Sequence, residues 1–297
     1  MSKTAIVCDS NTAITQAQAK EMGIYVLPSP FHIEGQTYYE DVSLTTDQFY
    51  QKLSDKIDVA TSQPSPEAVM GLWDRALEDH DELVYIPLSS GLSGSCSSAY
   101  GYSQEPKYEG RVYVIDNQRV SVTQRQSVLD AMLLADMGKG AKEICDILTE
   151  DKFNSSIYIM LDTLYYLKKG GRITPAVAAL GTLLRLKPVL QIQGEKLDTY
   201  AKARTVKQGK EIMIDAVKRD IKNRFGGLDN PGGVFLSIAH THNLEAAMEF
   251  KAEVEALFPQ FGEVHVDELS LVIACHLGPG ALALTATKKL PYYDESL

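Results

Sequence analysis

The chain has 297 residues, 44% of them hydrophobic and 23% charged, enough for the core of one large domain or of two ordinary ones. Its 29 basic and 39 acidic residues give a net charge of −10, which argues against nucleic acid as the main partner because phosphate binding needs a basic face. No apolar run reaches the roughly 20 residues of a membrane span. The N-terminal residues do not resemble an export signal, so we expect a cytoplasmic protein with reduced cysteines.

Strand and helix patterns alternate through the first half of the chain, as is typical of a mostly parallel sheet covered by helices. Glu34-Gly35 predicts a hairpin turn. The predicted strands are Thr4–Cys8, Ile24–Leu27, Leu83–Leu88 and Val112–Ile115, and the predicted helices are Thr15–Met22, a helix capped by Ser65, Ser93–Tyr100 and Ser121–Met137.

Beyond about residue 150 hairpins mix with helices, so a mixed sheet is expected there. The strands predicted in this half are Ser156–Leu161, Val189–Gln193, Lys196–Tyr200, Val234–Ala239, Glu263–Glu268 and Ala281–Ala286, and the helices are Thr163–Lys169, Ala176–Leu184, Lys207–Arg224 and Leu244–Phe258. The chain is therefore predicted to be an α/β protein with two domains, residues 1–153 and 154–297.

Four short clusters combine hydroxyl groups and glycines with cationic or imidazole side chains. They are Thr61-Ser62-Gln63-Pro64-Ser65, Ser89-Ser90-Gly91-Leu92-Ser93-Gly94, Lys168-Lys169-Gly170-Gly171-Arg172 and His276-Leu277-Gly278-Pro279-Gly280. Small residues let a ligand approach the backbone, and the other side chains supply hydrogen-bond donors. No cluster holds a strong acid–base pair, which favours holding an oxyanion over breaking a bond.

The cluster that ends at Ser93-Gly94 follows a predicted buried strand, where α/β proteins gather their ligands. Backbone N–H groups at the start of the next helix would favour an anion there. Ser93 could instead cap that helix, or act as a hydrolase nucleophile. The hydrolase motif G-x-S-x-G fits poorly, because Ser95 stands where the second glycine belongs. We favour ligand contact by Ser93 and Gly94.

The other three clusters each contain residues that local structure does not explain. Helix capping accounts for Ser65 but leaves Thr61 and Ser62 as ligand candidates. A helix C-terminus accounts for the two lysines, whereas Arg172 lies beyond it and could contact a phosphate or a carboxylate. His276 precedes a rigid Gly-Pro-Gly turn, where it is either structural or a donor to an oxyanion.

Metal and nucleotide sites are not expected. His240 and His242 have a ligand-like spacing but no third ligand nearby. Asp9 and Asp116 each end a predicted strand, and capping of the following loop is favoured over metal binding. The sequence contains no P-loop and no G-x-G-x-x-G motif.

Taken together and in this order, the motifs resemble the DegV family of bacterial fatty-acid-binding proteins, which includes the lipid-carrying subunit of the fatty acid kinase system. The resemblance runs from Cys8 to Leu284. The motifs that carry it are Asp9-Ser10, Thr61-Ser62-Gln63-Pro64, Ser89-Ser90-Gly91-Leu92-Ser93-Gly94, Leu167-Lys168-Lys169-Gly170-Gly171-Arg172-Ile173, Lys187-Pro188-Val189-Leu190, Lys202-Ala203-Arg204-Thr205 and His276-Leu277-Gly278-Pro279-Gly280.

The resemblance implies two α/β domains with the ligand between them. Thr61, Ser93 and His276 would reach the carboxylate of a long-chain fatty acid such as palmitate, stearate or oleate. The acyl chain would enter a tunnel in the first domain. Arg172 would lie near the mouth, facing the phosphoryl group and the catalytic subunit of a fatty acid kinase. The carrier itself would be a non-enzymatic monomer without a cofactor, active in phospholipid metabolism, with transient membrane contact.

The alternative is a serine-dependent lipid hydrolase or acyltransferase that uses Ser93.

The chain also departs from the family pattern without losing a headgroup donor. Asn117 stands where the family usually has serine, Cys275 precedes the histidine where small residues are common, and Ala283 replaces a frequent glycine. These departures leave the acyl preference open.

Overall fold

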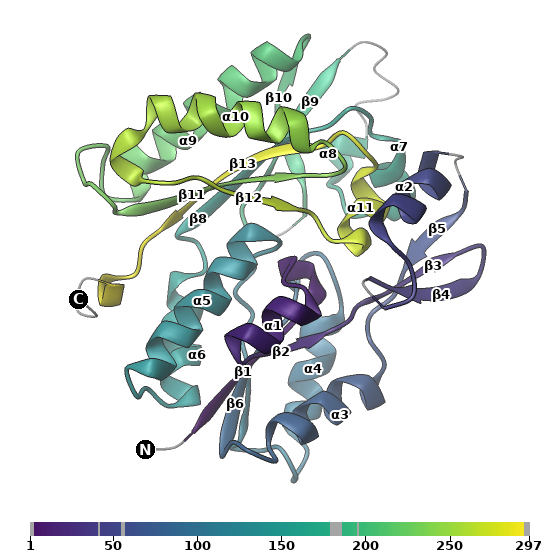
Figure 1. Ribbon diagram of the computed structural model, residues 1–297, viewed down its shortest axis with the longest axis vertical. Coiled ribbons are helices and arrows are strands. Elements are labelled where there is room, and N and C mark those ends of the chain that lie inside the picture. The colour runs from purple at the N-terminus through teal and green to yellow at the C-terminus, as the bar shows by residue number, and fades with distance from the viewer. Residues whose placement is uncertain (1–2, 41, 55–56, 179–185, 195, 294–297) are drawn as a thin grey trace.

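A parallel sheet between helices forms one half of the molecule (Figure 1). The computed structural model describes residues 3–40, 42–54, 57–178, 186–194 and 196–293. The strand order is β2-β1-β6-β7, and all three strand pairs are parallel. The elements are β1 (Thr4–Asp9), β2 (Tyr25–Leu27), β6 (Glu82–Ile86), β7 (Val112–Val114), η1 (Ser10–Thr12), α1 (Gln16–Met22), α3 (Pro66–Ala76), α4 (Ser95–Ser103), α5 (Val122–Asp136) and α6 (Ala141–Asp151).

Alternate side chains of β1 enter two different cores, because successive residues of a strand point to opposite faces. Ile6 and Cys8 pack with apolar side chains of α1, α5 and α6. Ala5 and Val7 pack with those of α3 and α4. The parallel sheet predicted for this half, with helices on its faces, is confirmed.

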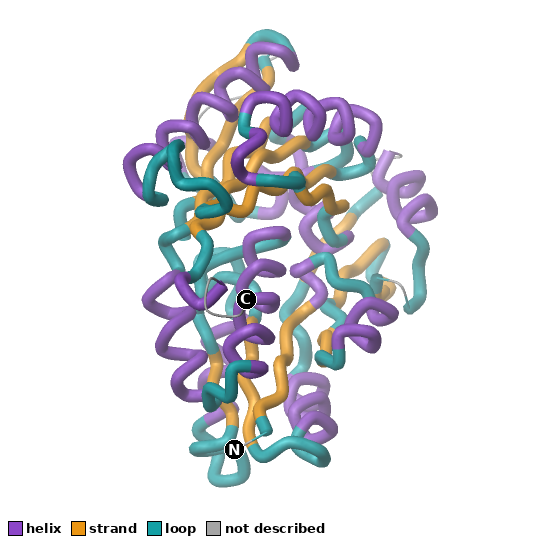
Figure 2. The backbone as a smooth tube through the Cα atoms, turned by 60° about the vertical axis from the view of Figure 1, so that its left-hand side comes forward, coloured by secondary structure: helices purple, strands orange, loops and turns teal. Residues whose placement is uncertain are grey.

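A six-stranded mixed sheet forms the second half, in the order β10-β9-β8-β13-β11-β12. Only the pair of β11 and β12 is parallel among its described strands. Helices α9 and α10 cover one face, as Figure 2 shows from a second direction. The elements are β8 (Ser155–Met160), β9 (Lys187–Ile192), β10 (Asp198–Ala203), β11 (Val234–His240), β12 (His265–Glu268), β13 (Leu282–Lys288), α9 (Val206–Arg224), α10 (Leu244–Leu257) and η2 (Pro259–Phe261).

The other face of this sheet turns toward the first half. Ile157, Leu190 and Ala283 belong there to one apolar cluster with Leu88 and Val120, which come from the first half of the chain. The two halves therefore share a hydrophobic surface, and the candidate site lies on it.

A small antiparallel sheet, which the sequence analysis did not separate from the first half, packs against the second half. It consists of β4, β3 and β5 in that order, with the predicted turn at Glu34-Gly35 between β3 and β4. Its core joins apolar residues of α2 to those of α11 and α7. The elements are β3 (Pro30–Ile33), β4 (Gln36–Tyr39), β5 (Val59–Thr61), α2 (Thr46–Ser54), α7 (Tyr165–Gly170), α8 (Pro175–Ala178), α11 (Leu271–Leu277) and η3 (Pro291–Tyr293).

Several predicted boundaries differ from the observed ones. The apolar run before His276 forms helix α11, so His276 lies in the last helical turn rather than in a loop. Only the beginning of the helix expected over Ala176–Leu184 is described, because residues 179–185 lie outside the described residues. No helix in the described part of the chain is long and apolar enough to cross a membrane.

Asp9 ties the strand ends of the first half together. Its carboxylate accepts hydrogen bonds from the backbone N–H of Leu88 at 2.7 Å, from that of Asn11 at 3.0 Å and from the side-chain amide of Gln124 at 3.1 Å. Complete burial raises the pKa of Asp9, and these hydrogen bonds oppose the shift. Asp116 likewise accepts from the backbone and the hydroxyl group of Ser90. Asp9 therefore has the predicted capping role in the turn that follows it, whereas Asp116 holds the loop at Ser90 and not the loop that follows it.

Candidate ligand-binding site

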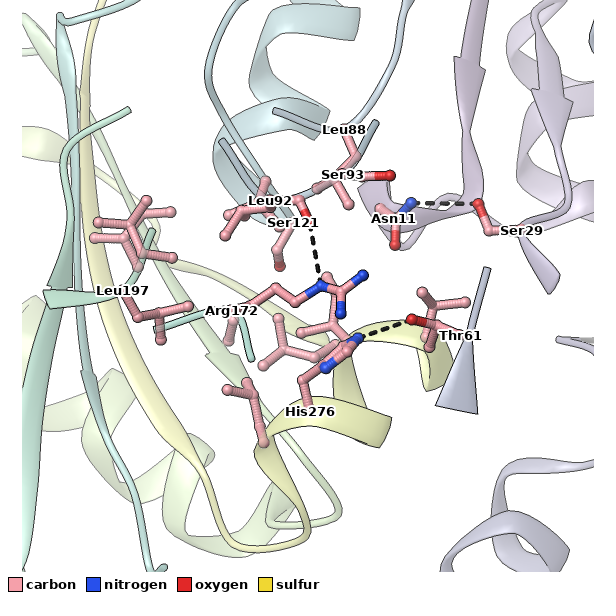
Figure 3. A pocket seen from close by; sticks show the side chains of 18 of the residues that line it. Asn11, Ser29, Thr61, Leu88, Leu92, Ser93, Ser121, Arg172, Leu197 and His276 are labelled. Carbon is pink, nitrogen blue, oxygen red and sulfur yellow. Dashed lines mark hydrogen bonds between the residues drawn. The ribbon is translucent and has the colours of Figure 1, made fainter. Parts of the chain in front are cut away.

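A pocket lies between the two halves, with about 960 Å³ of space free of atoms, including the part open to solvent, and Figure 3 shows side chains that line it. Its walls are mainly aliphatic, and its polar side chains include members of all the predicted clusters. The aliphatic residues are Leu88, Leu92, Val120, Val122, Ile157, Ile159, Leu167, Ile192, Leu197, Ala239, Leu269, Val272, Ile273, Leu277 and Ala283. Most of these belong to the second half of the chain, whereas the expected tunnel was in the first domain. A cavity of this character suits an apolar ligand with one polar end.

Thr61 and His276 meet at the polar end of the pocket. The hydroxyl oxygen of Thr61 lies 2.9 Å from Nε2 of His276, although 215 residues separate them in the sequence. Thr61 ends β5, and His276 lies on α11, so the packing of the small sheet on α11 creates this contact. Gly170 leaves room for the imidazole, because a Cβ atom there would lie 2.1 Å from Nδ1 of His276.

His276 is held in its neutral form. Burial, and secondarily the positive charge of Arg172, lower the pKa of His276 to about 4. Its Nδ1 atom is buried and has no hydrogen-bond partner among the described residues. A neutral imidazole carries one proton, so Thr61 and His276 together form a pair that can offer a donor without adding charge.

Ser93 lies in the loop between β6 and α4 and lines the pocket together with Ser95. The hydroxyl oxygen of Ser93 accepts a hydrogen bond from the backbone N–H of Ser95 at 3.2 Å. Gly94, exposed, is the residue before α4, and a Cβ atom at this position would lie 3.1 Å from the side-chain oxygen of Gln63. The small residues thus let the two hydroxyl-rich loops approach each other.

Arg172 extends into the pocket between these loops and His276, as Figure 3 shows. Its Nη1 donates to the backbone oxygen of Gly170 at 2.5 Å, and its Nε donates to that of Leu92 at 3.4 Å. The side chain is half-buried, whereas the sequence analysis expected it at the mouth. Arg172 directly follows Gly171, which ends α7 in the left-handed conformation with φ of 69°.

Ser62 is exposed at the edge of the pocket, where its hydroxyl oxygen lies 2.9 Å from Nε2 of His32. His32 belongs to the neighbouring strand β3 and also contacts Thr37 at 3.1 Å. The structure therefore brings Thr61, Ser62, Ser93, Gly94, Arg172 and His276 to one region.

Several further polar residues line the pocket that were not predicted for the site, among them Asn11, Ser29 and Ser121. The side-chain amide of Asn11 donates to Asp9 at 3.0 Å and to the hydroxyl group of Ser29 at 3.2 Å. No local pattern in the sequence points to Ser29 or Ser121.

Both histidines of the ligand-like pair make other local contacts. Nδ1 of His240 accepts a hydrogen bond from the backbone N–H of Asn243, and the ring of His242 stacks on Tyr50 with centroids 4.5 Å apart. The described residues contain no group of three or more histidine, cysteine, aspartate or glutamate side chains able to hold a metal ion.

Comparison with known proteins yields matches along the whole fold. A solved DegV family protein from Thermus thermophilus, described as fatty acid binding, is 30% identical; the match has a TM-score of 0.87 and covers 97% of this chain and 100% of that one. DegV of Bacillus subtilis, described as a fatty acid binding protein, is 26% identical with a TM-score of 0.84, over 97% of this chain and 100% of that one.

A DegV domain-containing protein of Deinococcus radiodurans is 30% identical over 281 residues, which cover 94% of this chain and 96% of the relative. Residues 3–289 match the family described as "Uncharacterised protein, DegV family". That match spans the parallel sheet, the mixed sheet and every loop that supplies a polar side chain to the pocket. The chain therefore belongs to the DegV family.

Proposed function

We propose that the chain binds a long-chain fatty acid in this pocket, with its carboxylate held by Thr61, Ser93 and His276. The observation that carries the proposal is the division of the pocket into long aliphatic walls and one end with hydroxyl, imidazole and guanidinium groups. Ser62 and Gly94 border the same end. The fatty-acid-binding relatives from Thermus thermophilus and Bacillus subtilis support this choice of ligand.

The carboxylate and the tail of such a ligand each contribute to the free energy of binding in a way that suits one kind of pocket wall. A carboxylate buried without hydrogen bonds is costly, and neutral donors can bind it without placing further charges beside the tail. The tail contributes roughly 0.8 kcal/mol per buried CH₂ group, or on the order of 10 kcal/mol for sixteen carbons before the costs of binding. Because the aliphatic residues come mostly from the face of the mixed sheet, we propose that the tail lies along β8 and β9 and extends past Val122.

We further propose that the protein presents the carboxylate to the catalytic subunit of a fatty acid kinase, which forms the acyl phosphate. The pocket offers donors but no strong acid–base pair, so the phosphoryl transfer would depend on the partner. Arg172 is the cation best placed to neutralise the added charge, since backbone oxygens accept from two of its N–H groups and no described residue pairs with the others. We also propose that residues 1–153 and 154–297 form two domains. The protein would be a cytoplasmic monomer that contacts the membrane transiently.

The hydrolase alternative needs a base that activates Ser93. Among the described residues, the hydrogen bond recorded for its hydroxyl oxygen comes from a backbone N–H, and Nε2 of His276 pairs with Thr61 instead. A serine-reactive probe separates the two functions: labelling of Ser93 supports the hydrolase, and an unlabelled protein supports the carrier.

The protein purified without detergent should carry a long-chain fatty acid from its expression host in near-equimolar amount. The physical reason is that the aliphatic walls of the pocket remove the acyl chain from water. Solvent extraction followed by mass spectrometry measures the bound acid against a control protein prepared in the same way. Fatty acid no more abundant than in the control would refute the proposed function.

Ser93→Ala should retain less fatty acid than the matched variant Ser97→Ala. Ser93 lines the pocket, whereas Ser97 lies exposed within α4 and away from the lining residues. Loss of one donor to a buried carboxylate costs roughly 1–3 kcal/mol, or about 5- to 150-fold in affinity. Equal retention by two folded variants would remove Ser93 from the headgroup site.

His276→Ala should weaken fatty acid retention by roughly 5-fold or more while the protein stays folded, because it removes a donor and leaves Thr61 without its partner. His276→Gln is the matched control, since an amide can still donate to Thr61. With a pKa of about 4, His276 stays neutral at pH 7 and gains a proton only as the pH falls toward that value. Retention should therefore show no step near the ordinary histidine pKa of 6.5.

Two results would contradict this role of His276. The first is a step in retention near pH 6.5 that His276→Gln abolishes. The second is normal lipid binding by His276→Ala together with a melting temperature lowered by several degrees, which would make the residue structural.

Arg172→Ala should keep most of its bound fatty acid but lose acyl phosphate formation with the cognate kinase and ATP. An acyl phosphate carries more charge than a carboxylate, and a guanidinium group matches it with two parallel hydrogen bonds. Arg172→Lys should restore product only in part, because an ammonium group is a point charge. Bound lipid and product are both measured by mass spectrometry. Full product from Arg172→Ala, or wholesale loss of its lipid, would disprove this division of roles.

A further inference from the structure

Ser121 places a hydroxyl group without a partner in the wall of the aliphatic pocket. The side chain is 4% exposed, and its Oγ makes no hydrogen bond to any described residue. Figure 3 shows this side chain among those that line the pocket. Its neighbours in the sequence, Val120 and Val122, are buried aliphatic residues of the same wall. A buried hydroxyl group left bare is destabilising, and most buried polar atoms in proteins are satisfied.

The backbone at Ser121 is also strained. Its φ of 56° and ψ of −134° lie in a region that glycine adopts freely and serine does not. The backbone N–H of Ser121 donates to the oxygen of Asn11 at 3.1 Å, which links this conformation to the loop held by Asp9. The conformation thus holds the hydroxyl group on the pocket side at an energetic cost that a glycine would avoid.

Ser121 stands directly before α5 as its N-cap residue, and its hydroxyl oxygen accepts no hydrogen bond from the first N–H groups of this helix of 15 residues. The first N–H groups of a helix carry partial positive charge and favour an oxygen acceptor. The pocket wall therefore combines a bare hydroxyl group with the start of a long helix, and both would be satisfied by an oxygen atom on the ligand.

We propose that Ser121 recognises an oxygen substituent on the acyl chain, so that the preferred ligands are hydroxylated fatty acids. This inference rests on the proposed function, because Thr61, Ser93 and His276 are taken to hold the carboxylate. A hydroxyl group on the chain can accept from Ser121 or from the helix N-terminus and can donate in return. An unsubstituted chain leaves Ser121 bare.

Competition between ligands tests the inference. The full chain is incubated with equal amounts of palmitic acid and one hydroxypalmitic acid, repurified and extracted, and the ratio of bound acids is read by mass spectrometry. A series of isomers moves the hydroxyl group along the chain. We expect at least one isomer to be preferred, and Ser121→Ala to lower that preference by roughly 3- to 10-fold, the worth of one hydrogen bond.

Ser121→Gly also lacks the hydroxyl group, so it should lower the preference for the hydroxylated acid as Ser121→Ala does. Because glycine relieves the backbone strain, this variant carries the test if the alanine variant folds poorly. Ser97→Ala should keep the ratio of the unmodified protein. An unchanged ratio in both Ser121 variants for every isomer would overturn the inference, as would an equal loss of plain and hydroxylated acids, which would place Ser121 on the carboxylate. Retention of neither acid by the unmodified protein would instead refute the proposed function from which the inference starts.

Discussion

Apolar packing between the small sheet and α11 is the constraint on which the polar end of the pocket depends. The core they share is built from aromatic and aliphatic side chains, including Phe31, Phe49 and Leu271. This core sets Thr61 against His276, and the same burial holds the imidazole neutral. A polar pocket end made in this way needs no ion pair, because the surrounding packing supplies both the position and the charge state of Thr61 and His276.

The local parts of the fold could be predicted from the sequence, whereas the contacts between distant segments could not. Alternating apolar residues and turn residues such as Glu34-Gly35 act over a few positions, so the strands of both large sheets and this hairpin were found. The short apolar run before His276 does not distinguish a strand from a helix by its period, and α11 was missed. Likewise, the candidate loops were identified one by one, but no local signal shows that Thr61 meets His276 or that Arg172 turns inward.

Two kinds of buried polar group surround the pocket, and they differ in how completely they are satisfied. Asp9 accepts hydrogen bonds from the loops on either side of it and so fixes the ends of β1 and β6 relative to α5. Nδ1 of His276 and Oγ of Ser121 have no partner among the described residues. Satisfied groups such as Asp9 hold the frame, whereas the bare hydroxyl group of Ser121 belongs to the pocket lining and the bare Nδ1 of His276 lies against Gly170.

Helix α11 carries His276 and also contributes Val272, Ile273 and Leu277 to the aliphatic wall. Any displacement of this helix would separate the imidazole from Thr61 and widen the cavity in the same movement. For the proposed fatty acid ligand, capture of the headgroup and enclosure of the tail would therefore be a single equilibrium, and a ligand that touches both would favour the closed state by its whole difference in affinity between the two states. Such coupling would make release of the lipid depend on one helix and its contacts.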